Sequence, residues 1–126
     1  MKKSKNSNIA KEIIIAEDDP DILEILTIIA EKAGYTVETT VDGQSLMGNR
    51  VSWPNLIIMD RRLRGLDGLE ICQHLKKSSK TKNIPIVIIS ATPDLASCAK
   101  NAGASDFLEK PFNVKDIQNM INKYIH

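Results

Sequence analysis

Short apolar runs alternate with longer amphipathic segments along the 126-residue chain. An apolar run without a period of two is typical of a parallel strand that helices cover on both faces. Three runs of this kind predict central strands, over Ile13–Ala16, Leu56–Met59 and Ile84–Ile89. Two shorter and more polar runs, Tyr35–Thr40 and Asp106–Glu109, suit the flanks of the same sheet.

The amphipathic segments predict five helices, because their apolar residues recur at helical spacing. Asp19 and Asn113 are good capping residues for the first and the last helix. The second helix should be short or distorted, since Gly48 and Asn49 interrupt its pattern. The predicted helices are Pro20–Ala33, Gly43–Val51, Gly68–Lys76, Pro93–Ala102 and Val114–Tyr124.

Five strands that alternate with five helices predict an α/β fold with a single doubly wound parallel sheet. The length suffices for one domain with its own hydrophobic core. We expect this domain over residues 11–126. The basic segment over residues 1–10 reads as a disordered lead-in, since no apolar stretch typical of a signal peptide follows it.

Composition narrows the function. The formal net charge is +1 and both signs are interspersed, so neither nucleic acid nor an anionic membrane is favoured as a partner. No apolar run approaches the roughly 20 residues needed to span a bilayer. Cys72 and Cys98 are far apart and suit reduced thiols, which is typical of a cytoplasmic protein.

Polar residues follow the predicted strands, at the edge where doubly wound sheets bind their ligands. These residues are Glu17, Asp18, Asp19, Asp60, Ser90 and Lys110. The three consecutive acids repel one another unless a cation offsets their charge, and carboxylate oxygens suit Mg²⁺. A carboxylate beside such a metal, with a hydroxyl and a lysine at the same spot, is equipped to accept a phosphoryl group. Asp19 by itself is better explained as a helix cap, and Asp67-Gly68 as a turn that starts a helix.

The stretches "IIIAEDDPDI", "PNLIIMDRRLRGLDGLEICQHLK", "IPIVIISA" and "AGASDFLEKPF", with the spacing between them, resemble the receiver domain of bacterial two-component response regulators. The resemblance extends from about Lys11 to Tyr124. It implies a flavodoxin-like sheet with strand order 2-1-3-4-5, flanked by five helices. It also implies a signalling domain rather than an enzyme, with no catalysis beyond its own phosphotransfer and autodephosphorylation.

By this resemblance, Asp60 is the phosphoacceptor for a histidine kinase or a phosphotransfer protein. Glu17 and Asp18 would hold Mg²⁺ together with Asp60 and the backbone carbonyl of Arg62. Without the rest of the set, Glu17 and Asp18 would be interpreted as a solvated acidic turn.

The resemblance also assigns a response to phosphorylation. Ser90 would hydrogen-bond the phosphoryl group and Lys110 would pair with its oxygens, aimed by a cis peptide before Pro111. The fourth helix, fifth strand and fifth helix would form the switching face, with Phe107 changing rotamer. Taken singly, Ser90 could simply end a strand, and Lys110 could belong to an ordinary loop.

Two departures from the family pattern stand out. Arg64 occupies a place in the loop after Asp60 where a proline is usual, within the basic run Arg61-Arg62-Leu63-Arg64. The Arg62 guanidinium could pair with the phosphoryl group, or with Glu17 without metal; a solvated or partner-facing arginine is equally compatible with the sequence. Phe107 replaces a frequent tyrosine, so it has no hydroxyl to offer a partner.

Three other functions are compatible with parts of this pattern. A phosphohydrolase with an aspartate nucleophile would need a second aspartate where Arg62 lies. A flavin-binding sheet of the same topology would need a phosphate-binding first loop, which Glu17-Asp18-Asp19 would repel. The serious alternative is a degenerate receiver that binds proteins without phosphorylation.

The sequence ends directly after the last predicted helix. We therefore expect the domain to act by docking on a downstream partner, or to be a fragment of a larger regulator or hybrid kinase. Dimerisation on phosphorylation stays open.

Overall fold

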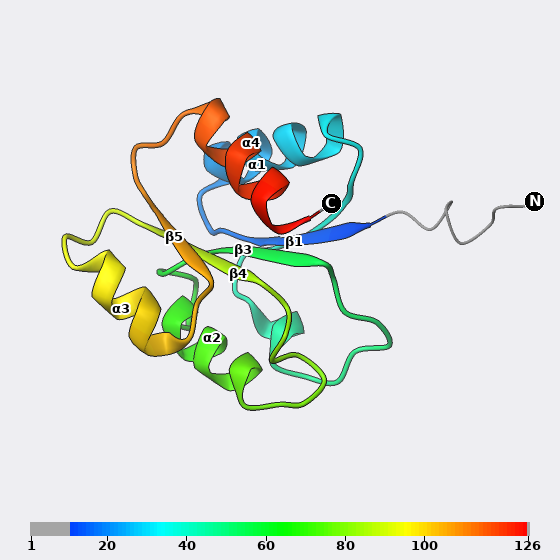
Figure 1. Cartoon of the computed structure of the whole chain (residues 1–126), viewed down its shortest axis with the longest axis vertical. Helices are drawn as coiled ribbons and strands as arrows, with labels where there is room; N and C mark the ends of the chain where they lie inside the picture. The colour runs from blue at the N-terminus through cyan, green and yellow to red at the C-terminus, as the bar shows by residue number, and fades with distance from the viewer. Residues whose placement is uncertain (1–10, 126) are drawn as a thin grey trace, which may run out of the picture.

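The computed structural model describes residues 11–125 and contains one five-stranded, fully parallel sheet (Figure 1). The strand order is β2-β1-β3-β4-β5, as predicted. The strands are β1 (Glu12–Ala16), β2 (Thr36–Thr40), β3 (Leu56–Asp60), β4 (Ile86–Ser90) and β5 (Asp106–Glu109). The predicted lead-in over residues 1–10 lies outside the described residues.

Helices cover both faces of the sheet. Figure 1 shows α1 and α4 on one face, with α2 and α3 on the other. The helices are α1 (Pro20–Lys32), α2 (Gly68–Lys76), α3 (Leu95–Ala102) and α4 (Val114–Tyr124). Because all the strands are parallel, each crossover returns the chain to the same end of the sheet, as the doubly wound fold requires.

The prediction of five helices is wrong by one, because residues 11–125 contain four α-helices and a single 3₁₀ turn, η2 (Gln44–Leu46). Gly43 precedes this turn with a left-handed backbone (φ 75°), and only Leu46 of the turn is buried. One buried anchor leaves little apolar area to offset the entropy of ordering a longer helix.

Several other boundaries differ from the prediction by one or two residues, and the two largest shifts are at the starts of α3 and β4. Helix α3 begins at Leu95 rather than Pro93, after a turn in which Leu95 N–H donates to the Thr92 carbonyl. Strand β4 begins at Ile86 rather than Ile84. The Ile84 N–H donates to the Thr81 carbonyl (3.0 Å) and closes a turn, so it does not pair with a neighbouring strand.

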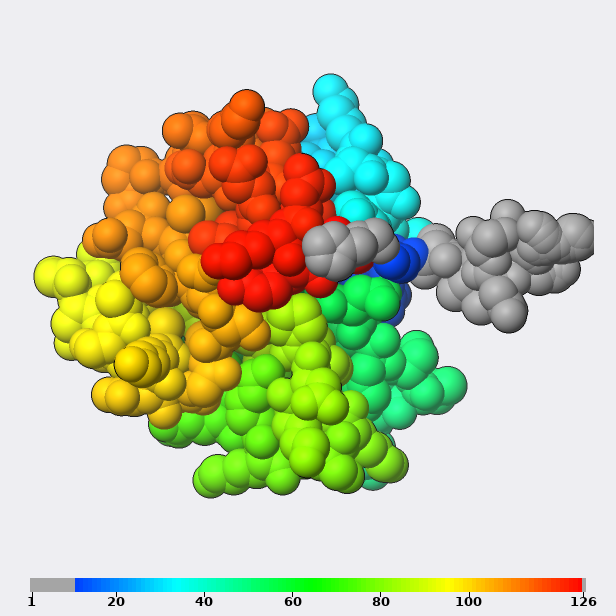
Figure 2. All heavy atoms as spheres, in the orientation of Figure 1, coloured from blue at the N-terminus to red at the C-terminus, as the bar shows by residue number. Residues whose placement is uncertain are grey.

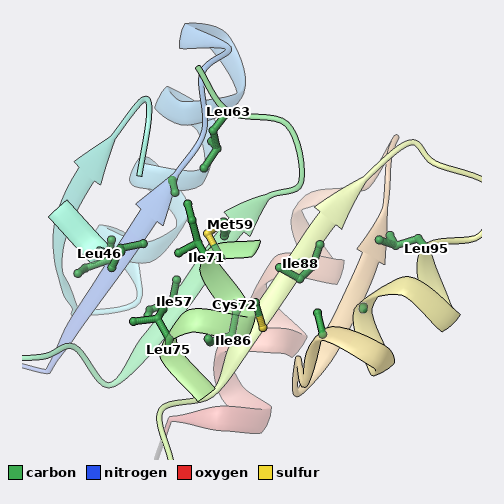
Figure 3. Close-up of a cluster of buried hydrophobic side chains, with 14 residues drawn as sticks. Leu46, Ile57, Met59, Leu63, Ile71, Cys72, Leu75, Ile86, Ile88 and Leu95 are labelled. Atoms are coloured by element: carbon green, nitrogen blue, oxygen red, sulfur yellow. The ribbon is translucent and has the colours of Figure 1, made fainter. Parts of the chain in front are cut away.

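The core consists of two buried clusters, one on each side of the sheet. Side chains of a strand point alternately to its two faces, so Ile13 and Ile15 pack beneath α1 and α4, while Ile14 packs beneath α2. Figure 3 shows the second cluster, where Ile71, Cys72 and Leu75 of α2 meet β3 and β4. Burial on both faces explains why the central strands are continuous apolar runs.

The predicted helix caps are confirmed. Asp19 Oδ1 accepts hydrogen bonds from the N–H groups of Asp21 (2.9 Å) and Ile22 (3.3 Å). Asp67 caps α2, and Asn113 caps α4 through a reciprocal capping box with Asp116. Within the described part of the chain, none of the helices has the length and apolarity that crossing a membrane requires.

Candidate functional site

A crevice of about 440 Å³ opens at the carboxyl ends of β1, β3, β4 and β5. It is lined by Glu17, Asp18, Asp19, Asp60, Arg62, Ser90, Ala91, Thr92 and Lys110. The structure thus brings together the predicted site residues with one exception. Phe107 lies on β5, half-buried against the core cluster beneath α2 and α3.

Asp60 lies at the centre of this crevice. It is the last residue of β3, and only 5% of its surface is exposed. Its Oδ1 accepts a hydrogen bond from the Arg62 N–H (2.9 Å), and its Oδ2 accepts one from Lys110 Nζ. Two donors hold the carboxylate in place, while the crevice leaves it reachable from outside.

Lys110 reaches Asp60 from the end of β5 and has the expected cis peptide before Pro111. Its Nζ also lies 3.3 Å from Glu17 Oε1. Burial disfavours the ammonium charge, but the hydrogen bond and charge of Asp60 outweigh this effect and raise the pKa of Lys110. The lysine is therefore a permanent positive charge shared by two carboxylates.

Glu17 is almost fully buried, with 1% of its surface exposed. Its Oε2 accepts the Asp19 N–H (3.1 Å), whereas Oε1 receives no hydrogen bond from any described residue. Burial, followed by the adjacent Asp60 carboxylate, raises the pKa of Glu17 from 4.5 to about 7. A second cation in this crevice would lower that cost, and the donor set of buried carboxylate oxygens is the one that Mg²⁺ prefers.

The fit to Mg²⁺ rests on few protein ligands. Among residues 11–125, no cluster of three or more Asp, Glu, His or Cys side chains has metal-binding geometry. Mg²⁺ needs none, because it is usually bound by one or two carboxylates and keeps several waters. Half-buried Asp18 lines the crevice together with the buried carboxylates of Glu17 and Asp60, both of which Lys110 contacts.

Ser90 ends β4 and is 3% exposed. Its Oγ accepts the Thr92 N–H (3.0 Å) and lies 2.6 Å from Thr92 Oγ1. The sequence interpretation did not identify Thr92, although a second hydroxyl two residues beyond a candidate site serine was visible.

Arg62 contributes its backbone to the site, and its side chain is exposed at the rim. It does not pair with Glu17, whose partner is Lys110, and its guanidinium forms no ion pair within residues 11–125. The loop that carries it is closed by a bridge to Asp67. The open position of the guanidinium leaves room for an anionic group at the rim.

Gly68 is a second residue whose importance was not predicted. A Cβ at this position would lie 2.3 Å from the Asp60 carbonyl oxygen and 3.1 Å from the Arg61 Cα. The first turn of α2 therefore packs directly on the backbone that carries Asp60. Only tertiary contact shows this requirement, since the sequence signals no more than a turn.

The parallel sheet, with an acidic pair, a strand-end aspartate and a lysine at its carboxyl edge, defines a flavodoxin-like domain with a charged crevice at the end of its strands. The profile of the response regulator receiver domain matches residues 13–122. The chain therefore belongs to this family, which serves two-component signalling.

Individual relatives agree with this assignment. The DNA-binding dual master transcriptional regulator RpaA of Synechocystis is 35% identical over 108 residues, which are 83% of this chain and 45% of that protein. The phosphate regulon regulatory protein PhoB of Escherichia coli is 31% identical over 111 residues, 86% of this chain and 48% of that protein. The chain thus spans about half the length of the curated relatives it matches.

Among solved structures, the receiver domain of the sensor histidine kinase PA1611 from Pseudomonas aeruginosa is 26% identical, with a TM-score of 0.79. The match covers 92% of this chain and 98% of that one, whose active-site cleft coordinates a magnesium ion.

Proposed function

We propose that the domain is a phosphorylation switch in which Asp60 receives a phosphoryl group from a histidine kinase or a phosphotransfer protein. The observation that carries this proposal is the contact of Lys110 Nζ with both Asp60 and Glu17 inside one crevice. A buried carboxylate next to a fixed cation is suited to attack phosphorus, since the charge that develops on the phosphoryl oxygens is already balanced.

Glu17, Asp18, Asp60 and the backbone carbonyl of Arg62 would hold Mg²⁺ in this proposal. The bound ion would neutralise phosphoryl charge, which is the usual service of Mg²⁺ in phosphoryl transfer. The buried Oε1 of Glu17 supports this ligand set, because it receives no hydrogen bond within residues 11–125 and shares the Lys110 ammonium with Asp60. A bound cation would offset the charge that Lys110 leaves uncompensated.

The transfer would exchange one bond at phosphorus for another. The bond from phosphorus to the donor histidine nitrogen breaks as the bond to an Asp60 oxygen forms. Lys110 would release Asp60 and pair with the phosphoryl oxygens, and the Ser90 O–H would donate a hydrogen bond to one of them. These two donors replace the water that would otherwise solvate the group.

The proposed response passes from Ser90 to the face formed by α3, β5 and α4. These helices correspond to the fourth and fifth predicted from the sequence, because η2 takes the place of the second. Figure 2 shows the three segments along one side of the molecule. Phosphorylation adds about two negative charges at Asp60, and a pull on Ser90 would shift the packing of Phe107.

The donor protein would also contact an apolar groove beside the crevice, of about 620 Å³. Ala91 and Lys110 line both cavities, so the groove adjoins the crevice and lies within reach of a protein docked over Asp60. Ile25 (48% exposed) and Val114 (51%) lie on its walls. We therefore expect an apolar surface on the kinase or phosphotransfer protein to pack here.

The wider setting follows from the same proposal. The domain would act in the cytoplasm, where its free Cys72 and Cys98 stay reduced, and would signal to a downstream protein or an output domain. Dimerisation through the α3, β5 and α4 face after phosphorylation would be one such output.

The test uses acetyl phosphate with Mg²⁺ and reads the intact mass of the protein. We expect one phosphoryl group on the wild type and none on Asp60→Asn, nor on wild type with Mg²⁺ removed by EDTA. Glu109→Gln, an exposed acid at the end of β5, is the matched control and should gain the group normally. No gain in the wild type, also with a panel of purified kinases, would mean a degenerate receiver that works by binding alone.

A further inference from the structure

Thr92 is held against Ser90 by two hydrogen bonds that converge on one atom. Ser90 Oγ accepts the Thr92 N–H at 3.0 Å, and the two hydroxyl oxygens are 2.6 Å apart. That separation lies within the range of a strong O–H···O hydrogen bond. Thr92 lines the crevice, and its carbonyl accepts the Leu95 N–H (3.3 Å), which links the loop to α3.

The proton count at Ser90 restricts what its hydroxyl can do. A hydroxyl carries one proton and two lone pairs, and one lone pair of Ser90 Oγ already accepts the Thr92 N–H. If the Ser90 O–H donates its hydrogen bond to Thr92 Oγ1, it cannot also donate one to a phosphoryl oxygen. If the Thr92 O–H donates to Ser90 Oγ instead, both lone pairs of Ser90 Oγ are used as acceptors. The Ser90 O–H is then free to point into the crevice.

A phosphoryl group favours the second arrangement. Its oxygens only accept hydrogen bonds, and a hydrogen bond to an ionised acceptor is roughly twice as strong as one between neutral groups. The resulting chain from Thr92 to Ser90 to the phosphoryl oxygen also strengthens each bond through polarisation. Thr92 keeps an acceptor throughout, because Ser90 Oγ stays beside it.

We propose that Thr92 is a positioning residue that turns Ser90 into a dedicated donor for the phosphoryl group. Thr92 Oγ1 donates to Ser90 Oγ, the Thr92 N–H fixes the same oxygen, and Thr92 itself does not touch the phosphoryl group. The proposal deepens the function proposed above for Asp60 and rests on it.

Thr92→Val is the informative variant, since it keeps the branched shape and removes the hydroxyl. Its phosphorylation by acetyl phosphate and Mg²⁺, followed by intact mass, should be roughly fivefold slower, the loss expected for one neutral hydrogen bond. Thr92→Ser retains the donor and should stay within about twofold of wild type. Thr36→Val, an exposed threonine at the opposite end of the sheet, is the matched control and should change nothing.

A double-mutant cycle distinguishes positioning from a general structural effect. Thr92→Val should cost nothing further in a Ser90→Ala background, because the hydroxyl that it positions is already gone. Equal slowing in both backgrounds, or equal slowing by Thr92→Ser and Thr92→Val, would overturn the proposal. Beryllofluoride, a phosphoryl analogue, gives an equilibrium check: its affinity, followed by NMR, should fall in Thr92→Val and recover in Thr92→Ser.

The two proposals fail in different ways. A wild-type chain that gains no phosphoryl group refutes the role of Asp60, and the role of Thr92 with it. A wild type that is phosphorylated normally, with Ser90→Ala slow and Thr92→Val unchanged, refutes only the role of Thr92. Far-ultraviolet circular dichroism of each variant shows that the fold is retained.

Discussion

Replacing Glu17 with glutamine should make the protein more stable while it disables the switch. Burial and the adjacent Asp60 raise the pKa of Glu17 from 4.5 to about 7. The folded protein therefore binds this proton more tightly than the unfolded chain does, so the free energy of unfolding falls as the pH rises from 4.5 to 7. At 1.36 kcal/mol for each pKa unit, the cost of the charge above pH 7 is about 3 kcal/mol.

Glutamine carries no charge and keeps an oxygen that can accept the Asp19 N–H. At pH 8 without metal, the free energy of unfolding of Glu17→Gln should thus exceed that of the wild type by up to about 3 kcal/mol. The loss of one anionic partner of Lys110 reduces this gain. The gain should shrink through pH 6 and approach zero below about pH 4, where Glu17 is protonated in both the folded and the unfolded state.

Urea unfolding followed by circular dichroism at pH 8, 6 and 5, in EDTA, measures this difference. With a slope of about 2 kcal/mol per molar urea, the midpoint at pH 8 should shift by about 1.5 M. Glu31→Gln, an exposed glutamate on α1, is the matched control and should show no such pH-dependent gain. A difference in urea midpoint between variant and wild type that is equal at pH 8 and pH 5 would refute the reasoning. So would a variant that is less stable than the wild type at pH 8.

The function of this variant should change in the opposite direction. Loss of an anionic metal ligand should lower the rate of phosphorylation by acetyl phosphate at least tenfold. Substitution of residues that only hydrogen-bond the metal ligands already costs about that factor in many metal sites. Added Mg²⁺ should stabilise the wild type more than Glu17→Gln and narrow the gap at pH 8. If Mg²⁺ stabilised both equally, Glu17 would not be a ligand.

Four further substitutions test other parts of the structure. Gly68→Ala should destabilise the fold by more than about 2 kcal/mol in urea, because its Cβ would overlap the Asp60 carbonyl oxygen; an unchanged midpoint would show that α2 can shift freely. Asn113→Ala should cost about 1 kcal/mol through loss of the capping box, with a smaller loss for Asn113→Ser. Ile25→Glu should slow phosphotransfer from a kinase that phosphorylates the wild type, yet leave acetyl phosphate rates unchanged; slowing in both assays would argue against donor docking. Arg62→Ala should shorten the phosphoryl half-life roughly threefold if the guanidinium pairs with the phosphoryl group, and unchanged decay would remove it from the mechanism.

Much of the fold was readable in the sequence, for reasons that the packing makes clear. The apolar runs in β1, β3 and β4 have no alternation because both faces of these strands are buried, and α2 and β5 have the predicted bounds. Asp19 and Asn113 predicted the starts of their helices correctly, because a helix cap depends only on hydrogen bonds within three residues of the sequence. The prediction of a second helix was wrong because a helix there depends on how many side chains reach the core. Among the side chains of this segment only that of Leu46 is fully buried, while Met47 packs partly against the core.

The sequence by itself determined which chemistry is available at the carboxyl edge of the sheet. Parallel strands with short loops must bring Glu17, Asp60, Ser90 and Lys110 to one edge, wherever the helices lie. Only the tertiary structure decided how these groups share their protons and charges. It places Lys110 rather than Arg62 against Glu17, places Thr92 within hydrogen-bond distance of Ser90, and packs Gly68 directly on the backbone of Asp60. Hydrogen bonds and close contacts depend on separations of a few tenths of an ångström, which a pattern of residues does not encode.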